Sequence, residues 1–170
     1  MRKTHKTGTS PSTHIEGLEV RSSPIQGRGC FTTLPIKRGT CILEYTGRRI
    51  RVSEANHLYS TRPSTYLFAL SDGHTCIDGI GIGSLINHSC RPNCEPFEDE
   101  SGRIFFHSRR NIVAGEELTI DYQIGNSNER EMECCCGAPN CRGTMFSRRE
   151  LAVRKKRKVA ATKSPRPMKG

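Results

Sequence analysis

The sequence has no hydrophobic run long enough to cross a membrane. A spanning helix needs about 18 or more mostly apolar residues in succession, and none of the 170 residues lies in such a run. Residues 1–10 are polar and basic and contain no apolar core, so we do not expect a secretory signal there. No internal repeat is evident, and the length suits one folded domain with tails. We therefore expect no membrane contact.

The sequence also lacks the even number of cysteines that a complete disulfide framework requires. It contains nine cysteines. In a chain without an expected export signal, that many cysteines indicate a reducing compartment, where thiols serve in metal binding or packing.

The positive charge is confined to the two ends of the chain. Residues 148–170 carry ten Lys/Arg and one acid, and residues 1–14 carry three basic residues and no acid. The middle, residues 15–147, has fourteen basic and sixteen acidic residues, so it is slightly acidic. A basic tail favours polyanions such as nucleic acid. A slightly acidic body suits a basic peptide, which is a separate function.

Short alternating or apolar segments separated by glycine-rich turns predict a mainly β domain with little helix. We expect a strand over 41–45 that ends before Gly47, and a short helix with Ser53 as its N-cap. The other expected strands are 18–20, the hairpin 66–70 and 75–77, the hairpin 94–97 and 104–108, and 118–122. The expected division is a disordered basic arm over 1–14, a folded domain over 15–125, a cysteine-bearing segment over 126–147 and a disordered basic tail over 148–170.

The segment 87–93, Asn-His-Ser-Cys-Arg-Pro-Asn, has the composition of a site. It follows an apolar run that we expect to be buried. That run contains Ile80, Ile82, Leu85 and Ile86. A tight turn would need only asparagine, serine and proline. The additional histidine and cysteine favour a functional role over a turn.

Three thiols within eight residues predict a metal site near the C-terminus. Cys134, Cys136 and Cys141 are separated by glycine and proline, which permit the sharp reversal that brings them together. Thiolates at this density in a reducing compartment most often bind zinc, and a structural site needs four ligands. Spacing leaves the fourth open among Cys30, Cys41, Cys76, Cys90 and Cys94.

Together the motifs resemble the SET-domain family of protein lysine methyltransferases, in that family's order. The resemblance covers about residues 15–146. The matching pieces are Gly27-Arg28-Gly29, Glu44-Tyr45-Thr46-Gly47, Tyr66-Leu67-Phe68, residues 87–94, residues 115–122, and the cysteine cluster with Arg142-Gly143, which resembles a post-SET segment. The block at 87–94 and the cysteine cluster are highly specific together, whereas the glycine motif alone is not. No cysteine-rich pre-SET segment precedes the domain, so we expect a minimal SET domain.

The resemblance implies a β-clip fold of several small sheets in which the segment holding Asn87 and the segment ending at Tyr122 cross as a C-terminal pseudoknot. It implies S-adenosylmethionine as donor and a lysine side chain as acceptor. It also implies Cys90 as the fourth ligand of one structural zinc ion, which would tie the C-terminal loop onto the main domain and close the lysine channel.

The resemblance assigns catalysis to Tyr122, whose hydroxyl would orient the amine, and to Tyr45, for which a packing role is the alternative.

The residues implied to bind the cofactor are Gly27, Arg28, Gly29, Tyr66, Asn87, His88 and Tyr122. For Arg28, a side chain that is simply solvated is the alternative to cofactor binding. His88 is expected to be locked by hydrogen bonds and not to act as a base.

Methyl transfer to an amine requires that amine to be neutral. A free lysine has a pKa of about 10.4, and an apolar channel beside a sulfonium disfavours its charged form. We expect deprotonation to come from this environment and a water path. Ile120 stands where some family members place a Phe or Tyr that restricts methylation. One support for monomethylation is therefore missing.

The implied partner is a basic protein carrying the target lysine, such as a histone tail or histone-like protein, in the nucleus or chromatin. For a bacterial effector this would be a host nucleus; the alternative is the bacterial cytoplasm or nucleoid.

An acidic run at Glu95 and 98–100 is either a solvated hairpin tip or an attractor of such a peptide. Residues 154–159 resemble an import signal and would serve equally as a nucleic-acid arm. Two other functions stay open: an inactive SET-fold peptide-binding module and a zinc-containing nucleic-acid-binding protein that uses its basic tail.

Overall fold

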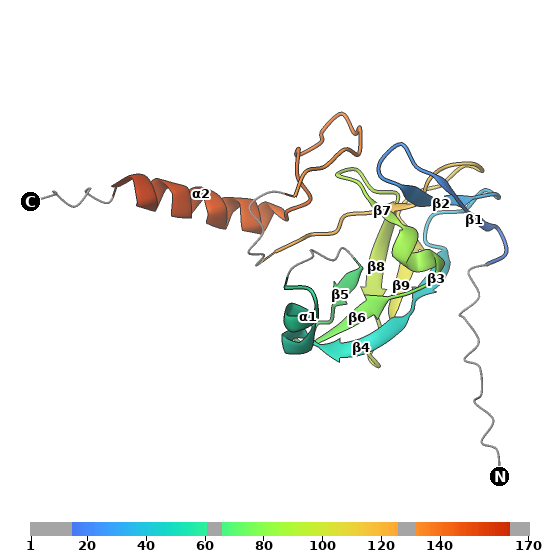
Figure 1. Ribbon diagram of the computed structural model, residues 1–170. Helices are drawn as coiled ribbons and strands as arrows, with labels where there is room; N and C mark the ends of the chain where they lie inside the picture. The colour runs from blue at the N-terminus through green and yellow to red at the C-terminus, as the bar shows by residue number, and fades with distance from the viewer. Residues whose placement is uncertain (1–14, 61–65, 126–131, 164–170) are drawn as a thin grey trace, which may run out of the picture.

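The computed structural model describes residues 15–60, 66–125 and 132–163, which form short strands and few helices (Figure 1). The predicted arm over 1–14 lies outside these residues. The elements are β1 (Leu18–Ser22), β2 (Arg28–Thr32), β3 (Cys41–Tyr45), β4 (Gly47–Arg51), α1 (Val52–Leu58), β5 (Leu67–Ala69), β6 (Thr75–Gly79), η1 (Ile82–Leu85), β7 (Asn87–His88), β8 (Cys94–Glu98), β9 (Ile104–Ser108), β10 (Thr119–Ile120) and α2 (Arg148–Lys163).

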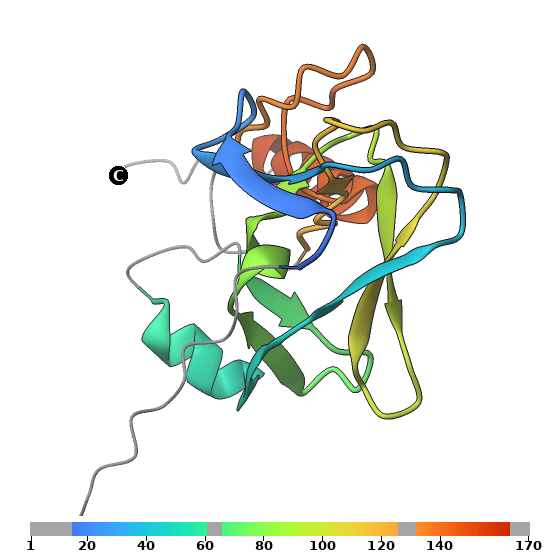
Figure 2. The same ribbon diagram turned by 90° about the vertical axis from the view of Figure 1, so that its right-hand side faces the viewer.

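The strands form four small sheets, as the β-rich sequence predicted. Two sheets have three strands, in the orders β3-β9-β8 and β4-β6-β5, and two have a pair each, β1-β2 and β7-β10. All pairs are antiparallel except β7 with β10. The predicted hairpins are confirmed as β5-β6 and β8-β9. Figure 2 shows the sheets from the side, with the β1-β2 ribbon above the β4-β6-β5 sheet.

The strand expected over 41–45 is confirmed as β3, and Gly47 begins the next strand, β4, where it pairs with Gly79. A Cβ at Gly47 would lie 2.1 Å from the Asp78 carbonyl oxygen, so the glycine permits this close pairing. The expected cap of the following helix was wrong. Ser53 is not the N-cap of α1, because β4 continues to Arg51, which takes that position without a side-chain cap.

The core lies where the β3-β9-β8 sheet meets the other sheets, and it fixes the position of Tyr45. Ile104 and Phe106 of β9 are fully buried. The Tyr45 ring lies 5.5 Å from the Phe106 ring and 5.6 Å from the Phe68 ring, centroid to centroid. Such tilted aromatic contacts add to the stabilisation that burial provides.

The segment 87–93 crosses the segment that ends at Tyr122, consistent with the expected pseudoknot. Asn87 pairs with Thr119 and His88 with Ile120 in the parallel β7-β10 pair. Asn93 is 2% exposed, and its side chain donates to the Glu117 carbonyl over 2.7 Å and accepts from the Thr119 amide over 2.8 Å. The crossing is therefore tied by a satisfied buried amide.

The apolar run before this crossing is buried only in part. Ile82 and Ile86 are 3% and 2% exposed, which anchors the segment as expected. Ile80 is 46% exposed, because it lies in the turn between β6 and η1, outside the core.

The expected disordered tail is corrected over 148–163, which form the helix α2. Ser147 begins this helix: its hydroxyl accepts the Glu150 amide over 3.1 Å, and its carbonyl accepts the Leu151 amide over 3.0 Å. Arginine, lysine, leucine and alanine, which favour helix, continue it. Among the residues that the structure describes, no helix is long and apolar enough to cross a membrane.

Candidate functional site

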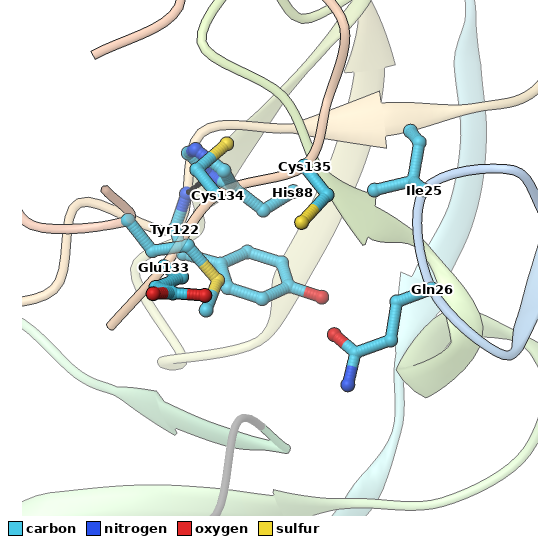
Figure 3. Close-up of a pocket in the computed structure, with 8 residues that line it drawn as sticks. Ile25, Gln26, His88, Tyr122, Glu133, Cys134 and Cys135 are labelled. Carbon is cyan, nitrogen blue, oxygen red and sulfur yellow. Dashed lines mark hydrogen bonds between the residues drawn. The ribbon is translucent and has the colours of Figure 1, made fainter. Parts of the chain in front are cut away.

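A cavity of about 250 Å³ lies where the loop before β2, the crossing strands and the cysteine segment meet (Figure 3). Its lining combines apolar, aromatic and polar groups from segments far apart in the chain. The lining residues are Ile25, Gln26, His88, Tyr122, Glu133, Cys134, Cys135 and Met145. A pocket with convergent polar groups at the junction of several segments is a candidate binding site.

Tyr122 occupies the centre of this cavity, with its hydroxyl directed toward Gln26 (Figure 3). The hydroxyl donates to the Ile86 carbonyl oxygen over 3.0 Å, and the ring lies 5.3 Å from the His88 ring. Burial raises the pKa of Tyr122 well above its usual value, and nearby Tyr66 and Glu117 raise it further. The phenol is therefore protonated at neutral pH and acts as a hydrogen-bond donor.

Tyr45 lies next to the same site and is 5% exposed. Its hydroxyl donates to the Tyr66 carbonyl oxygen over 2.5 Å. A Cβ at Gly79 would lie 2.0 Å from this hydroxyl oxygen, so Gly79 provides the space for it. Burial raises the pKa of Tyr45, as do the neighbouring ionisable groups of Tyr122 and Tyr66. The structure thus brings the three predicted tyrosines together, although the Tyr66 side chain is 47% exposed.

Asn87 holds the predicted glycine loop against the crossing strands. Its side-chain amide donates to the carbonyl oxygens of Gln26 and Arg28, over 3.2 and 3.1 Å, and to Glu117 Oε1 over 2.8 Å. Gly27 has φ +50, a conformation that favours glycine. The Arg28 side chain is exposed. In this structure Asn87 therefore positions the loop backbone beside the cavity.

Glu117 is a site residue that sequence reasoning missed. Its Oε1 accepts from the Asn87 side-chain amide over 2.8 Å. The Ser23 hydroxyl also donates to this carboxylate, at 2.8 Å from Oε1 and 3.0 Å from Oε2. Glu117 also fills the space beside Gly29, where a Cβ would lie 2.2 Å from Glu117 Oε1. The only sequence signal was its place in the 115–122 motif, which did not indicate what it contacts.

The four predicted metal ligands come together in space. The sulfur atoms of Cys90, Cys134, Cys136 and Cys141 all lie within 4.8 Å of one another. Cys90 Sγ is 3.8 Å from Cys134 Sγ and 3.9 Å from Cys141 Sγ. A tetrahedron with Zn–S bonds of about 2.3 Å has sulfur–sulfur edges of about 3.8 Å. The cluster therefore has the donor set and spacing of a tetrathiolate metal site.

Backbone amides surround these sulfurs in the way that thiolates require. The amides of Arg142, Cys90 and Gly143 donate to the sulfurs of Cys90, Cys136 and Cys141, over 3.3, 3.4 and 3.4 Å respectively. Burial raises the pKa of Cys136, but the amides of Cys90 and Ala138 and the neighbouring thiols outweigh it and lower that pKa to about 6. Burial instead raises the pKa of Cys90 and of Cys134. Cys136 is therefore the member of these three that most readily becomes a thiolate, the form that binds metal.

His88 connects the cysteine cluster to Tyr122. Its Nδ1 accepts the Tyr122 backbone amide over 3.1 Å, which leaves Nε2 to carry the proton. Nε2 lies 3.5 Å from Cys90 Sγ and can donate to it. Burial is the main reason that the pKa of His88 is lowered, to about 4, so the ring is neutral at neutral pH. The expectation that His88 is locked by hydrogen bonds and is not a general base agrees with this geometry.

Asp121 and Arg142, also missed from the sequence, form a second connection. The Arg142 guanidinium donates to both carboxylate oxygens of Asp121, over 2.8 and 2.7 Å. The two side chains are only 14% and 17% exposed. Bidentate charge-assisted pairs are among the strongest hydrogen bonds in proteins. This pair joins the residue beside Tyr122 to the residue beside Cys141.

The acidic run of β8 and the turn after it is largely engaged in structural contacts. Glu98 accepts from the Ser71 amide and hydroxyl, both over 2.8 Å. Asp99 accepts from Ser101 and pairs with Arg103 across the turn. Glu95 pairs with Arg109. This favours the solvated hairpin tip over a peptide attractor.

Comparison with known proteins gives one family and several relatives. The family model "SET domain" matches residues 27–123. The chain is 39% identical over 134 residues to "Histone-lysine N-methyltransferase, H3 lysine-4 specific" of Eremothecium gossypii, an alignment that covers 71% of this chain and 14% of that protein. It is 37% identical over 145 residues to "Histone H3-lysine(4) N-trimethyltransferase ATX1" of Arabidopsis thaliana, covering 78% of this chain and 14% of that protein.

A third relative is "Histone-lysine N-methyltransferase trr" of Drosophila melanogaster, 40% identical over 134 residues, with 72% of this chain and 6% of that protein covered. The chain thus spans between 6% and 14% of the length of these three relatives. The similarity concerns one region of much longer proteins.

Proposed function

The chain belongs to the SET-domain family, and on that basis we propose that it is an S-adenosylmethionine-dependent protein lysine N-methyltransferase acting on a histone or another basic chromatin-associated protein. The observation that carries the proposal is the position of Tyr122: its protonated hydroxyl lies in the cavity formed by the loop before β2, the crossing strands and the cysteine segment. These are the three parts that a donor, a catalytic hydroxyl and a closing loop would occupy.

The cofactor would be held by the loop at Gly27, Arg28 and Gly29, by Asn87 and His88, and by the rings of Tyr66 and Tyr122. When bound, S-adenosylmethionine supplies an electrophilic methyl group on a sulfonium. Asn87 supports this role by holding the carbonyls of Gln26 and Arg28, which fixes the loop backbone in one arrangement beside the cavity. Preorganisation of this kind lowers the entropy lost on binding.

The tyrosines would orient the lysine amine. Tyr122 and Tyr45 both keep their protons at neutral pH, since an ordinary tyrosine pKa is about 10 and burial raises both further. Neither phenol is therefore a base that takes the amine's proton, which would pass to solvent before the donor supplies its methyl group. Each hydroxyl donates its own proton to a backbone carbonyl, of Ile86 and of Tyr66 respectively, so it would align the amine by accepting a hydrogen bond from the amine N–H.

The four cysteines would hold one structural Zn²⁺. Four thiolates at tetrahedral spacing, with backbone amides donating to them, suit zinc better than a hard cation. The ion would fix residues 134–141 against Cys90 and so form one wall of the cavity. It would have no role in the chemical step.

The chemistry of the chain and the names of its relatives support the proposed substrate class and location. The relatives are named as histone-lysine methyltransferases, and the body of the chain, residues 15–147, is slightly acidic, which suits a basic peptide. We place the action of the protein on chromatin, in a nucleus or, for a bacterial chain, in a host nucleus or its own nucleoid.

A labelled-methyl assay tests the proposed function. Zinc-loaded protein is incubated with labelled S-adenosylmethionine and, separately, with each core histone and a basic bacterial chromatin protein. We expect label on one or a few lysines of one substrate, located by mass spectrometry and abolished when that lysine is changed to arginine. Failure of the zinc-loaded, folded protein to label any of these substrates would contradict the proposal.

Replacing Gly29 with alanine should weaken donor binding about tenfold, because the added methyl group displaces Glu117 and breaks its hydrogen bonds to Asn87 and Ser23. Each such bond to a charged group contributes about 1.5–3 kcal/mol, and about 1.4 kcal/mol is tenfold in affinity. Calorimetric titration with S-adenosylmethionine measures the effect. Gly125→Ala is the matched control, since the nearest atom to its Cβ is 3.8 Å away. Equal affinity of the two variants would show that the loop position does not matter.

A further inference from the structure

Helix α2 carries a concentrated positive charge that the proposed methyl transfer does not use. Six basic side chains on it are exposed. They are Arg148, Arg149, Lys155, Lys156, Arg157 and Lys158. They lie within eleven residues, about 16 Å of helix at about 1.5 Å per residue. The one acid of the helix, Glu150, is 7% exposed and pairs with Arg154. The exposed charge is therefore uncompensated along this part of the helix.

The start of α2 is fixed to the folded domain. Phe146, just before the helix, is 3% exposed, and the Arg154 guanidinium lies 3.9 Å from its ring centroid. Arg154 Nε also donates to Glu150 Oε1 over 2.7 Å. From this base the helix extends away from the sheets (Figure 1). The basic side chains therefore lie on a helix that projects from the folded domain.

We propose that α2 binds the phosphate backbone of double-stranded DNA. At 100° per residue, Arg148, Arg149, Lys155 and Lys156 lie on one stripe about 120° wide, with two residues at each end. The two ends are seven residues, or about 10.5 Å, apart. Duplex DNA presents about one negative charge per 1.7 Å along its axis. A duplex therefore presents about six negative charges over the length of this stripe.

The distribution of apolar residues on α2 argues against an anionic membrane as the partner. A helix that lies in a membrane interface needs one continuous apolar face. Leu151, Val153 and Val159 fall on different sides of α2, between basic residues. The body of the chain is slightly acidic, so the polyanion is directed to the helix and away from the proposed peptide site. If the proposed function holds, DNA contact would keep the enzyme close to histone tails.

Fluorescence anisotropy with a labelled duplex of about 20 base pairs, at several salt concentrations, tests the proposal on the full chain. We expect the quadruple variant Arg148→Gln, Arg149→Gln, Lys155→Gln, Lys156→Gln to bind at least about tenfold more weakly than wild type. The salt slope should fall by up to about 3.6, since each phosphate contact contributes about 0.9. The control is Arg38→Gln, Arg48→Gln, Arg51→Gln, Arg109→Gln, which removes four exposed charges from the body. It should keep nearly all the affinity.

Equal loss in both variants would overturn the proposal, because net charge alone would then explain binding. So would the absence of DNA binding by wild type, or tighter binding to anionic vesicles than to the duplex. Methyl transfer to a short peptide should be the same in both variants, whereas transfer to nucleosomes should fall only in the helix variant. DNA binding is measured without donor or peptide. Its result can therefore be interpreted even if the protein shows no methyl transfer.

Discussion

Replacing Tyr122 with phenylalanine should lower methyl transfer by about 10²–10³-fold while leaving the fold unchanged, since this is the range lost when one positioned hydrogen-bonding group is removed from an active site. The phenylalanine ring keeps the contact with His88, and the backbone amide that His88 accepts is retained. Only the hydroxyl disappears. The loss should fall on kcat, measured with labelled donor at saturating peptide, and circular dichroism should be unchanged.

Tyr59→Phe is the matched control for this prediction. Its hydroxyl donates to Asp78 Oδ2 over 2.8 Å and does not line the cavity, so the same atom is removed elsewhere. We expect its kcat to stay within about twofold of wild type, with at most a small loss of stability, because the Asp78 carboxylate that loses this partner is partly exposed to water. Full activity of Tyr122→Phe would refute the assigned role of the tyrosine.

Replacing Cys90 with alanine should remove the metal and most of the activity together. A structural zinc site needs four ligands, and the sulfur of Cys90 is the one that comes from the main domain. We expect bound zinc to fall from about one ion per chain to well below that, measured by atomic absorption after dialysis. The unfolding midpoint should also fall, because metal binding contributes free energy to folding.

The exposed thiol of Cys41 provides the control for the metal prediction. Cys41→Ser changes a cysteine of β3 that lies outside the cluster, so zinc content and activity should both be retained. Removing zinc from wild type with a chelator should reproduce the Cys90→Ala phenotype, and added zinc should restore it. A Cys90→Ala protein that still binds one ion per chain with full activity would rule out this ligand set.

The two predictions are connected by the contacts between the cluster and the cavity. His88 lies between Cys90 and the Tyr122 amide, and Arg142 joins Asp121 to the segment that begins at Cys134. Loss of the metal would free that segment and remove Cys134 from the cavity wall. Activity would then depend on zinc although no thiolate takes part in the transfer.

Several elements were predictable because their signals are local in the chain. The hairpins around 71–74 and 99–103 follow from turn residues between alternating segments, and the structure confirms both. Cys134, Cys136 and Cys141 meet because glycine and proline reverse the chain within eight residues. The cap of α1 was missed because the start of that helix depends on another segment: the Val52 amide donates to the His74 carbonyl. Helix α2 was missed although its signals are local, because the absence of an apolar pattern was given more weight than the Ser147 cap and the helix-favouring residues that follow it.

The sequence by itself determined that this is a mainly β chain with a thiol-rich segment and a specialised block at 87–93, since residue types and short spacings carry that information. Only the tertiary structure decided that Cys90 lies with the other three thiols, that Glu117 secures Asn87, and that Gly79 makes room for Tyr45. These contacts join residues 30 or more positions apart, and they depend on how the small sheets pack and where the two strands cross. The heptapeptide is a site because that crossing places the Asn87 side chain against the loop before β2 and Cys90 against the cysteine cluster.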